Sequence, residues 1–268
     1  NTHPLAVQAN GMPFTAIKAR FELALAEQQP RQFDLWVDAL NFADGKRNAG
    51  DATAVLQWRA PKPLEDGQPN PDLMAGDVDF KIDTRNVDAS VFASLPQPLS
   101  ITSSLQGTKN GNVVRVNSLT VRDREALLQG KLLAGLGGKM PLDLQLKLTA
   151  INPGNYIPDS GPLLQGKLNG DLFFKGELAP SGNNKSIDPF GELRLSLNDS
   201  TLANAPLVMN VEATGGSRRL SKVLLDLNVV GNTAFAKGSY GTAADFVEVD
   251  INLDELNRLG KLVQMNLG

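Results

Sequence analysis

The sequence predicts an all-β protein, an elongated and curled antiparallel sheet built from repeated short strands. Three observations predict it. Apolar and polar residues alternate with period two along most of the 268 residues, the alternating runs are short, and glycine-, proline- and asparagine-containing turn signals separate them. Segments with helical spacing are brief, at 88–95 and 254–263, so the chain does not read as alternating strands and helices.

The strands are expected wherever this alternation is cleanest. In each run the apolar residues fall on one side of an extended chain and the polar residues on the other. In chain order the runs are Phe21–Leu25, Phe33–Val37, Val78–Ile82, Leu142–Leu148, Leu193–Leu197, Leu207–Val211, Leu225–Val229 and Val247–Leu253. The turn signals between runs are Asp44-Gly45, Asn110-Gly111, Asn169-Gly170, Gly215-Gly216 and Gly231-Asn232.

We expect residues 1–268 to form a single rod-like segment of β-repeats, with a loop break near 60–75, where proline, glycine, asparagine and aspartate gather. Residues 98–132 also resemble 206–240 in the order of their apolar, glycine and proline positions. Repeated strand modules favour a stack in which each module contacts mainly its neighbours.

Composition excludes most catalytic chemistry. The chain has no cysteine and a single histidine, His3, which excludes thiol nucleophiles, disulfides, Cys/His zinc sites and histidine-based triads. Carboxylate pairs such as Glu248 and Asp250 fall on the polar side of strands, where burial does not tune them. With 26 Lys+Arg against 29 Asp+Glu the chain lacks the basic surface that nucleic acid requires. We therefore expect no enzyme, no catalytic residue, no metal, no cofactor and no nucleic-acid partner.

The apolar stripe is the remaining functional candidate, and it has two interpretations. In the first it is the core of an ordinary sandwich or solenoid. In the second the sheet curls without closing, which leaves an apolar groove suited to acyl chains, because each buried CH₂ contributes about 0.8 kcal/mol. Composition does not separate the two.

Several phrases of the second half of the sequence are distinctive in their order. They are Leu142–Leu148 leading into Ile151–Pro158, Leu168–Leu172, Lys175–Leu178, Gly191–Leu197, 228–238, and Val249–Leu253 with Leu256–Leu259. These phrases resemble the TamB family, the inner-membrane-anchored subunits of the translocation and assembly module of Gram-negative bacteria. The likeness covers about residues 112–268, and its motifs are diffuse and repeat-like.

The resemblance implies an AsmA-like periplasmic rod of folded-over sheet, a β-taco, with a hydrophobic concave face. Such proteins are similar to bridge-like lipid-transfer proteins, and the family works with a barrel partner in the outer membrane, TamA. The N-terminal anchor and the C-terminal end of the family are not recognisable here, so we expect an internal periplasmic piece of an anchored parent chain.

Together, the alternation and the resemblance predict a non-enzymatic segment whose groove conducts phospholipid between the inner and outer membranes. The alternative is a scaffold that assists assembly of outer-membrane β-barrels by β-strand addition. The residues expected to contact phospholipid acyl chains are Leu142, Leu144, Leu146, Leu148, Leu168, Leu172, Leu193, Leu195, Leu197, Val249, Ile251 and Leu253.

Overall fold

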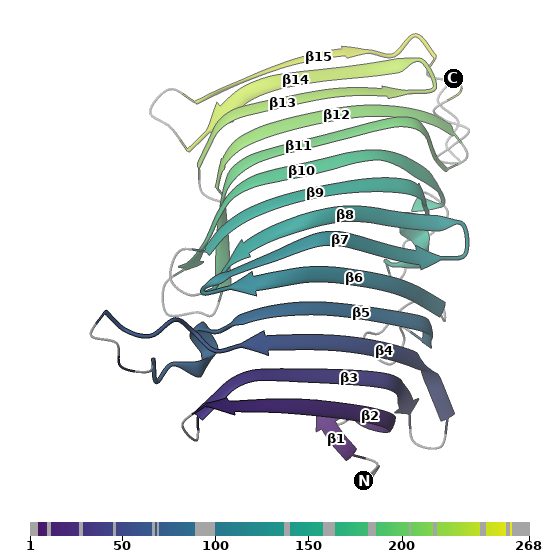
Figure 1. Cartoon of the computed structure of the whole chain (residues 1–268). Coiled ribbons are helices and arrows are strands. Elements are labelled where there is room, and N and C mark those ends of the chain that lie inside the picture. The colour runs from purple at the N-terminus through teal and green to yellow at the C-terminus, as the bar shows by residue number, and fades with distance from the viewer. Residues whose placement is uncertain are drawn as a thin grey trace. The chain divides into compact units, whose positions relative to one another are not determined.

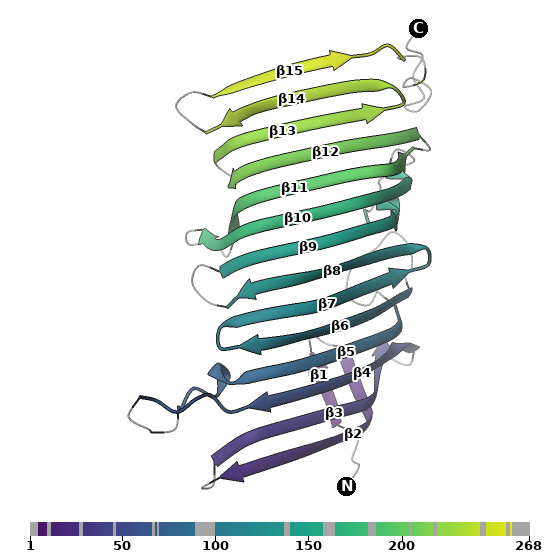
Figure 2. The same cartoon turned by 45° about the horizontal axis from the view of Figure 1, so that its top comes forward.

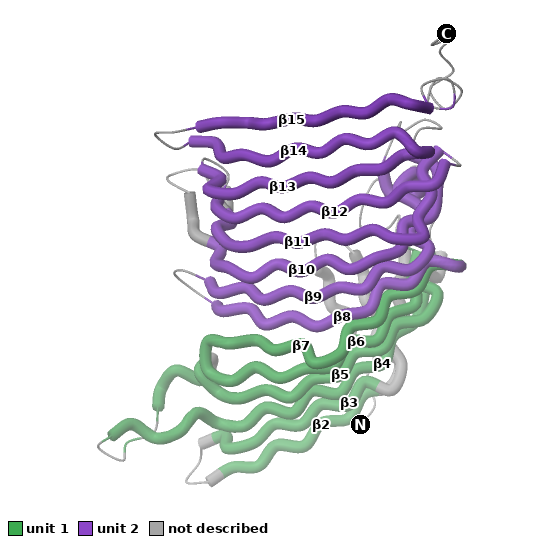
Figure 3. Tube along the Cα trace, turned by 90° about the horizontal axis from the view of Figure 1, so that it is seen from above, with its two compact units in different colours: residues 1–94, 98–124 green, residues 95–97, 125–268 purple. Residues whose placement is uncertain are grey.

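The computed structural model describes residues 5–9, 12–26, 29–44, 47–65, 68, 70–88, 100–136, 140–157, 164–181, 186–203, 205–216, 219–241, 245–255 and 258. These residues form fifteen strands and two short 3₁₀ helices, and within each unit the strands pair antiparallel with their neighbours in sequence (Figures 1 and 2). The predicted all-β, antiparallel fold is thereby confirmed. The chain divides into two compact units, which Figure 3 colours separately.

Unit 1 comprises residues 1–94 and 98–124 and is a meander of seven described strands. The loop between its fourth and fifth strands covers the region near 60–75 where a break is predicted, and it contains the helix η1 (Leu73–Ala75). The strands are β1 (Leu5–Ala9), β2 (Met12–Ala26), β3 (Gln29–Asp44), β4 (Arg47–Arg59), β5 (Asp77–Asp88), β6 (Ser100–Asn110) and β7 (Val113–Asp123).

Unit 2 comprises residues 95–97 and 125–268 and is a meander of eight described strands. The helix η3 (Pro153–Asn155) lies between its second and third strands and packs beside the third. The strands are β8 (Ala126–Gly135), β9 (Met140–Ile151), β10 (Gly166–Ser181), β11 (Ser186–Leu202), β12 (Ala205–Gly216), β13 (Arg219–Val229), β14 (Asn232–Tyr240) and β15 (Phe246–Asn252).

The tight turns form where two of the signals predict them. Asn110 pairs with Val113 across a two-residue turn that begins at Gly111, and Val229 pairs with Asn232 across Val230-Gly231. Val230 and Gly231 have φ values of 55° and 87°, the positive pair that a type I′ hairpin requires. A two-residue turn joins adjacent antiparallel strands, so these turns make β6 the neighbour of β7 and β13 the neighbour of β14.

The strands are longer than the alternating runs because bulges carry several of them past a bend. The predicted turn at Asn169-Gly170 is wrong, since both residues lie inside β10 at a register shift. The Asn169 side chain accepts a hydrogen bond from the Ala150 amide (2.8 Å) and donates one to the Asp199 carbonyl (2.7 Å). The Asn169-Gly170 pair, which is typical of a turn, therefore forms a bulge whose hydrogen bonds join three neighbouring strands.

The same bulge is closed by a buried hydroxyl. Ser200, which is 3 % exposed, accepts a hydrogen bond from the Asn169 amide (2.8 Å) and donates to a backbone carbonyl, with the carbonyls of Asn169 and Asn198 both within reach. Ala150 on β9 and Asp199 on β11 have φ values of 52° and 49°. The two strands on either side of β10 therefore adopt the left-handed backbone conformation where they bend. The hydrogen bonds satisfy the backbone groups that the shifted register leaves unpaired.

Few of the described apolar side chains in either unit are fully buried. Extensive contacts join each described strand only to its sequence neighbours, apart from η3 beside β10. In the described part of the chain, each sheet is thus a single layer, and the fully buried apolar side chains are Ala52, Val87, Val116, Ala126, Leu197, Ala205 and Leu207.

Candidate functional site

The strand registers of unit 2 place apolar residues in continuous rows on one side of the sheet. Residues paired directly across antiparallel strands point to the same side, so each row can be followed from strand to strand. We call this side the apolar face of unit 2. Its rows are Leu132–Leu144–Phe174–Leu193–Ala213–Val223–Gly238–Val247, Gly130–Leu146–Leu172–Leu195–Val211–Leu225–Ala236–Val249 and Leu128–Leu148–Gly170–Leu197–Met209–Leu227–Ala234–Ile251.

Ten of the twelve predicted contact residues belong to this face. Nine of them lie in the three rows above, and Leu142 lies in the next row along the strands, opposite Ala134 and Gly176. Leu168 lies opposite Ile151 beyond the bulge of β10, and Leu253 follows the last residue of β15. The strand register thus brings ten of the twelve predicted residues onto one surface.

Register also adds residues that the sequence phrases did not single out as contacts. Phe174 lies between Leu144 and Leu193 in the same row, and Val211 and Leu225 continue the row of Leu195. Val211 and Leu225 belong to alternating runs that the sequence shows, whereas Phe174 does not. Their place in one row depends on strand partners that lie 14 to 30 residues away along the chain, which no local signal gives.

The opposite side of unit 2 is polar and carries cross-strand ion pairs. The Nζ of Lys237 lies 3.0 Å from Oε2 of Glu248, and the Nζ of Lys222 lies 2.5 Å from Oε2 of Glu212. The hydrogen bond from Lys222, together with its positive charge, lowers the pKa of Glu212 from its usual value. Water solvates this side, so the sheet is amphipathic across its thickness.

The apolar face is only partly covered among the described residues. Leu144, Leu146, Leu172 and Leu195 are half-buried by neighbours on the same face, whereas Leu197 is 2 % exposed. At the β15 end exposure rises, and Ile251 is 59 % exposed. No described element forms a second layer on this face. Among the described residues, this side of unit 2 is therefore an open single-layer surface.

A row of glycines hollows the apolar face. Gly176, Gly191 and Gly215 lie directly opposite one another on β10, β11 and β12. A Cβ on Gly176 would stand 2.6 Å from the Gly191 Cα, closer than any side chain allows. A cavity of about 430 Å³ lies over this region, and its walls include Leu142, Phe174, Leu178, Leu193 and Leu220.

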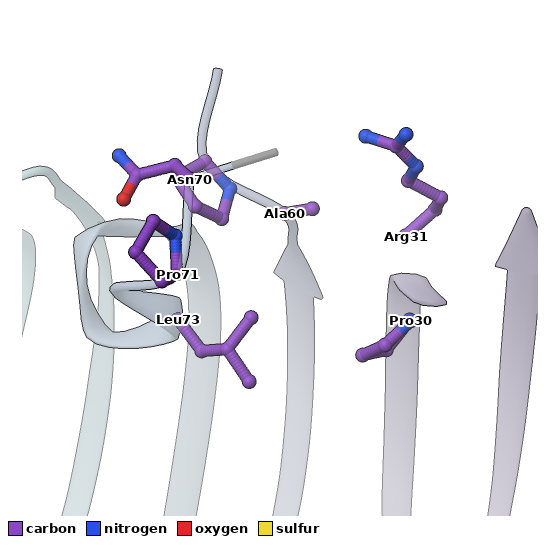
Figure 4. Close-up of a pocket in the computed structure, with 7 residues that line it drawn as sticks. Pro30, Arg31, Ala60, Asn70, Pro71 and Leu73 are labelled. Carbon is purple, nitrogen blue, oxygen red and sulfur yellow. The ribbon is translucent and has the colours of Figure 1, made fainter. Parts of the chain in front are cut away.

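Unit 1 repeats the amphipathic arrangement and holds a smaller cavity near its loop. One row of its apolar side runs through Phe21, Leu35, Leu56 and Phe80. The cavity, of about 330 Å³, is lined by Pro30, Arg31, Ala60, Asn70, Pro71 and Leu73, with Pro61 (Figure 4). Its walls combine three prolines with one guanidinium group and one amide, and they contain no carboxylate or hydroxyl group that would serve catalysis.

The apolar face of unit 2 is the candidate functional site, because its apolar rows continue across all eight described strands of the unit. In the described ranges no group of three or more His, Cys, Asp or Glu side chains could hold a metal ion. Nor does any helix in the described part of the chain have the length and hydropathy needed to cross a membrane. No protein-family model matches the chain, and comparisons with curated proteins and with solved structures gave no significant match.

Proposed function

We propose that the apolar face of unit 2 binds the acyl chains of phospholipids and that the chain is a periplasmic segment of a TamB-like lipid conduit, without enzymatic activity. The parent chain would be anchored in the inner membrane and meet a TamA-type barrel partner at the outer membrane. The observation that carries the proposal is the set of uninterrupted apolar rows that runs from β8 to β15 without a described covering layer.

The dimensions of the face suit an acyl chain. Eight strands give seven spacings of about 4.8 Å, or about 34 Å across the sheet. One leaflet of a bilayer has about 15 Å of hydrocarbon, half of the whole core. An acyl chain laid across the strands would therefore cover about three spacings, with each CH₂ removed from water contributing about 0.8 kcal/mol.

The repetition of the rows explains how such a ligand would move. Leu144, Phe174 and Leu193 succeed one another at the same level on adjacent strands. A chain that shifts by one strand exchanges one aliphatic or aromatic contact for another and keeps nearly the same buried apolar area. No deep energy minimum holds the ligand at one strand, which is the property a conduit needs.

Two adjacent leucines on β13 provide a matched test. Leu225 lies on the apolar face between Val211 and Ala236, whereas Leu224 lies on the polar side between Glu212 and Lys237. The chain is expressed in a Gram-negative host, purified without detergent, and its bound lipid is measured by native mass spectrometry and lipid extraction. Leu225→Asp is expected to remove bound phospholipid, and Leu224→Asp to retain it.

The outcomes separate the candidate functions. Phospholipid on the wild-type chain and on Leu224→Asp, with loss on Leu225→Asp, supports the lipid-binding face. Equal lipid content in both variants contradicts it, because the charge would then be tolerated where the acyl chain is placed. A wild-type chain that carries no lipid also contradicts the proposal and favours the barrel-assembly scaffold.

A further inference from the structure

We propose that the glycine row of unit 2 is a trough that holds one acyl chain, and that Leu142 and Leu220 at its two ends set the length of chain that fits. The inference rests on the proposed function and adds a seat and a specificity to it. The row Leu142–Gly176–Gly191–Gly215–Leu220 is paired directly across β9 to β13. None of the three leucine-rich rows of the apolar face has two glycines side by side, so this row interrupts their even succession of contacts.

The floor of the trough is made of backbone. A Cβ on Gly176, Gly191 or Gly215 would collide with a carbonyl oxygen of an adjacent strand, so no side chain rises from the floor. Each of the three glycines also lies on a strand that has a partner on both sides. The sheet therefore uses the N–H and C=O groups of the floor for its own hydrogen bonds and leaves none for a ligand.

The two long walls of the trough are apolar. One wall consists of Phe174, Leu193 and Ala213, and the other includes Leu178 and Pro189. None of the described residues that line the cavity of about 430 Å³ has a polar side chain. A cavity of this size falls in the range of small-ligand pockets, about 300–1,000 Å³. The trough is thus large enough for a ligand and has no group that would bind a polar one.

These walls favour a hydrocarbon chain over a polypeptide. An extended peptide would bring N–H and C=O groups that neither the floor nor the walls can pair, and each unpaired group costs free energy. Phe174 and Leu178 are four residues apart on β10, about 14 Å between backbones, and their side chains narrow this gap. The remaining width is less than the diameter of about 10–12 Å that a helix with its side chains needs. An acyl chain is thinner and requires no hydrogen bonds.

Leucines close both ends of the trough. Four strand spacings, about 19 Å, separate the backbones of Leu142 and Leu220, and each leucine side chain covers about half a spacing, so about 14 Å is free. An extended chain advances about 1.2 Å per bond, so the trough accepts about twelve carbons. The rest of the ligand, with its polar group, leaves through the side that no described element covers.

A single side chain limits the length at the β9 end. The row continues past Leu142 to Ala134 on β8, whose side chain is only a methyl group. Leu142→Ala therefore extends the trough by about one strand spacing, or about four carbons. Leu142→Trp shortens it, because the larger side chain reaches over the glycines. At the other end Leu220 is followed by Tyr240, so Leu220→Ala extends the trough by a smaller amount.

A series of saturated fatty acids tests the trough on the full chain freed of lipid. Their dissociation constants are measured by competition with a fluorescent fatty acid. In the wild type, each added CH₂ is expected to tighten binding by up to about fourfold until about twelve carbons are reached, and by much less beyond that length. Leu142→Ala is expected to move this break to about sixteen carbons, and Leu142→Trp to move it to shorter chains. Leu224→Ala, on the polar side of β13, is the control and is expected to leave the break in place.

The outcomes separate this inference from the proposed function. A break that the two Leu142 variants move in opposite directions supports the trough. Affinity that rises by the same factor throughout the series, or a break that neither variant moves, overturns the trough and leaves lipid binding by the apolar face intact. Absence of binding at every chain length overturns the trough and the proposed function together. Circular dichroism establishes that the variants are folded, and Leu220→Ala repeats the test at the other end if a Leu142 variant is not.

Discussion

Gly176 and Gly191 lie directly opposite each other on β10 and β11, and a Cβ added to either would stand 2.6 Å from the Cα of the other. The two strands therefore approach at a point where no side chain fits. The neighbouring rows carry Phe174 and Leu193 on one side and Leu178 on the other. The missing side chains between them leave the cavity on the apolar face.

Filling this position is expected to destabilise unit 2. Gly191→Val forces a branched side chain against the Lys175 carbonyl, which lies 2.4 Å from the position of the added Cβ. Overpacking of this kind costs about 1–3 kcal/mol of unfolding free energy. Urea unfolding measures the cost, with Ala213→Val on the adjacent strand as the control. Equal midpoints for the two variants would show that the strands do not approach this closely.

The buried hydroxyl of Ser200 is expected to stabilise the bulge between β10 and β11. Ser200→Ala leaves the Asn169 amide without its acceptor, and an unsatisfied buried donor costs about 1–3 kcal/mol. Thermal unfolding monitored by circular dichroism reports the loss. Ser118→Ala, at an exposed position on β7, serves as the control and is expected to change the unfolding free energy by less than about 0.5 kcal/mol. Indistinguishable variants would argue against the hydrogen-bond network.

Asp83 is expected to make part of the stability of unit 1 depend on pH. The hydroxyl of Ser104 donates a hydrogen bond to its carboxylate (2.6 Å), and this bond, assisted by Lys81, lowers the pKa of Asp83. Because the folded pKa lies below the unfolded one, the stabilisation is present above the unfolded pKa and is lost as pH falls through the folded pKa.

Removal of the Ser104 hydroxyl tests this dependence. Ser104→Ala is expected to raise the pKa of Asp83, followed by carboxyl NMR chemical shifts, and to reduce stability at neutral pH by about 1 kcal/mol. At a pH below both pKa values the difference between wild type and variant should shrink. A difference that stays constant over the acid range would assign the hydroxyl a role unrelated to the ionised carboxylate.

Ile251 offers a test of the lipid-binding face at little structural cost. Its side chain is 59 % exposed on the edge strand β15, so Ile251→Asp is expected to change the unfolding free energy by less than about 0.5 kcal/mol. The same change places a carboxylate at the end of an apolar row and is expected to lower the phospholipid retained after purification. Asn252→Asp, one residue further on the polar side, is the matched control. Loss of lipid from both variants would indicate a general charge effect.

The sequence by itself determined the fold class and the division of residues between two sides of a sheet. Leu142–Leu148 alternate so regularly that a β-strand with one apolar side is the arrangement that satisfies them. Period two is a local property, and it survives whatever partners a strand finds. The same locality explains the error at Asn169-Gly170, since an asparagine followed by glycine satisfies a bulge as well as a turn.

Only the tertiary structure decided which residues share a surface. The row from Leu144 through Phe174 to Leu193 and the facing glycines on β10 and β11 both depend on strand register. Register is fixed by turns, bulges and cross-strand contacts between residues distant in sequence, and a slip of one residue would send each side chain to the other side. The open, single-layer arrangement of the described strands also depends on tertiary packing, because the same apolar stripe would line a closed core equally well.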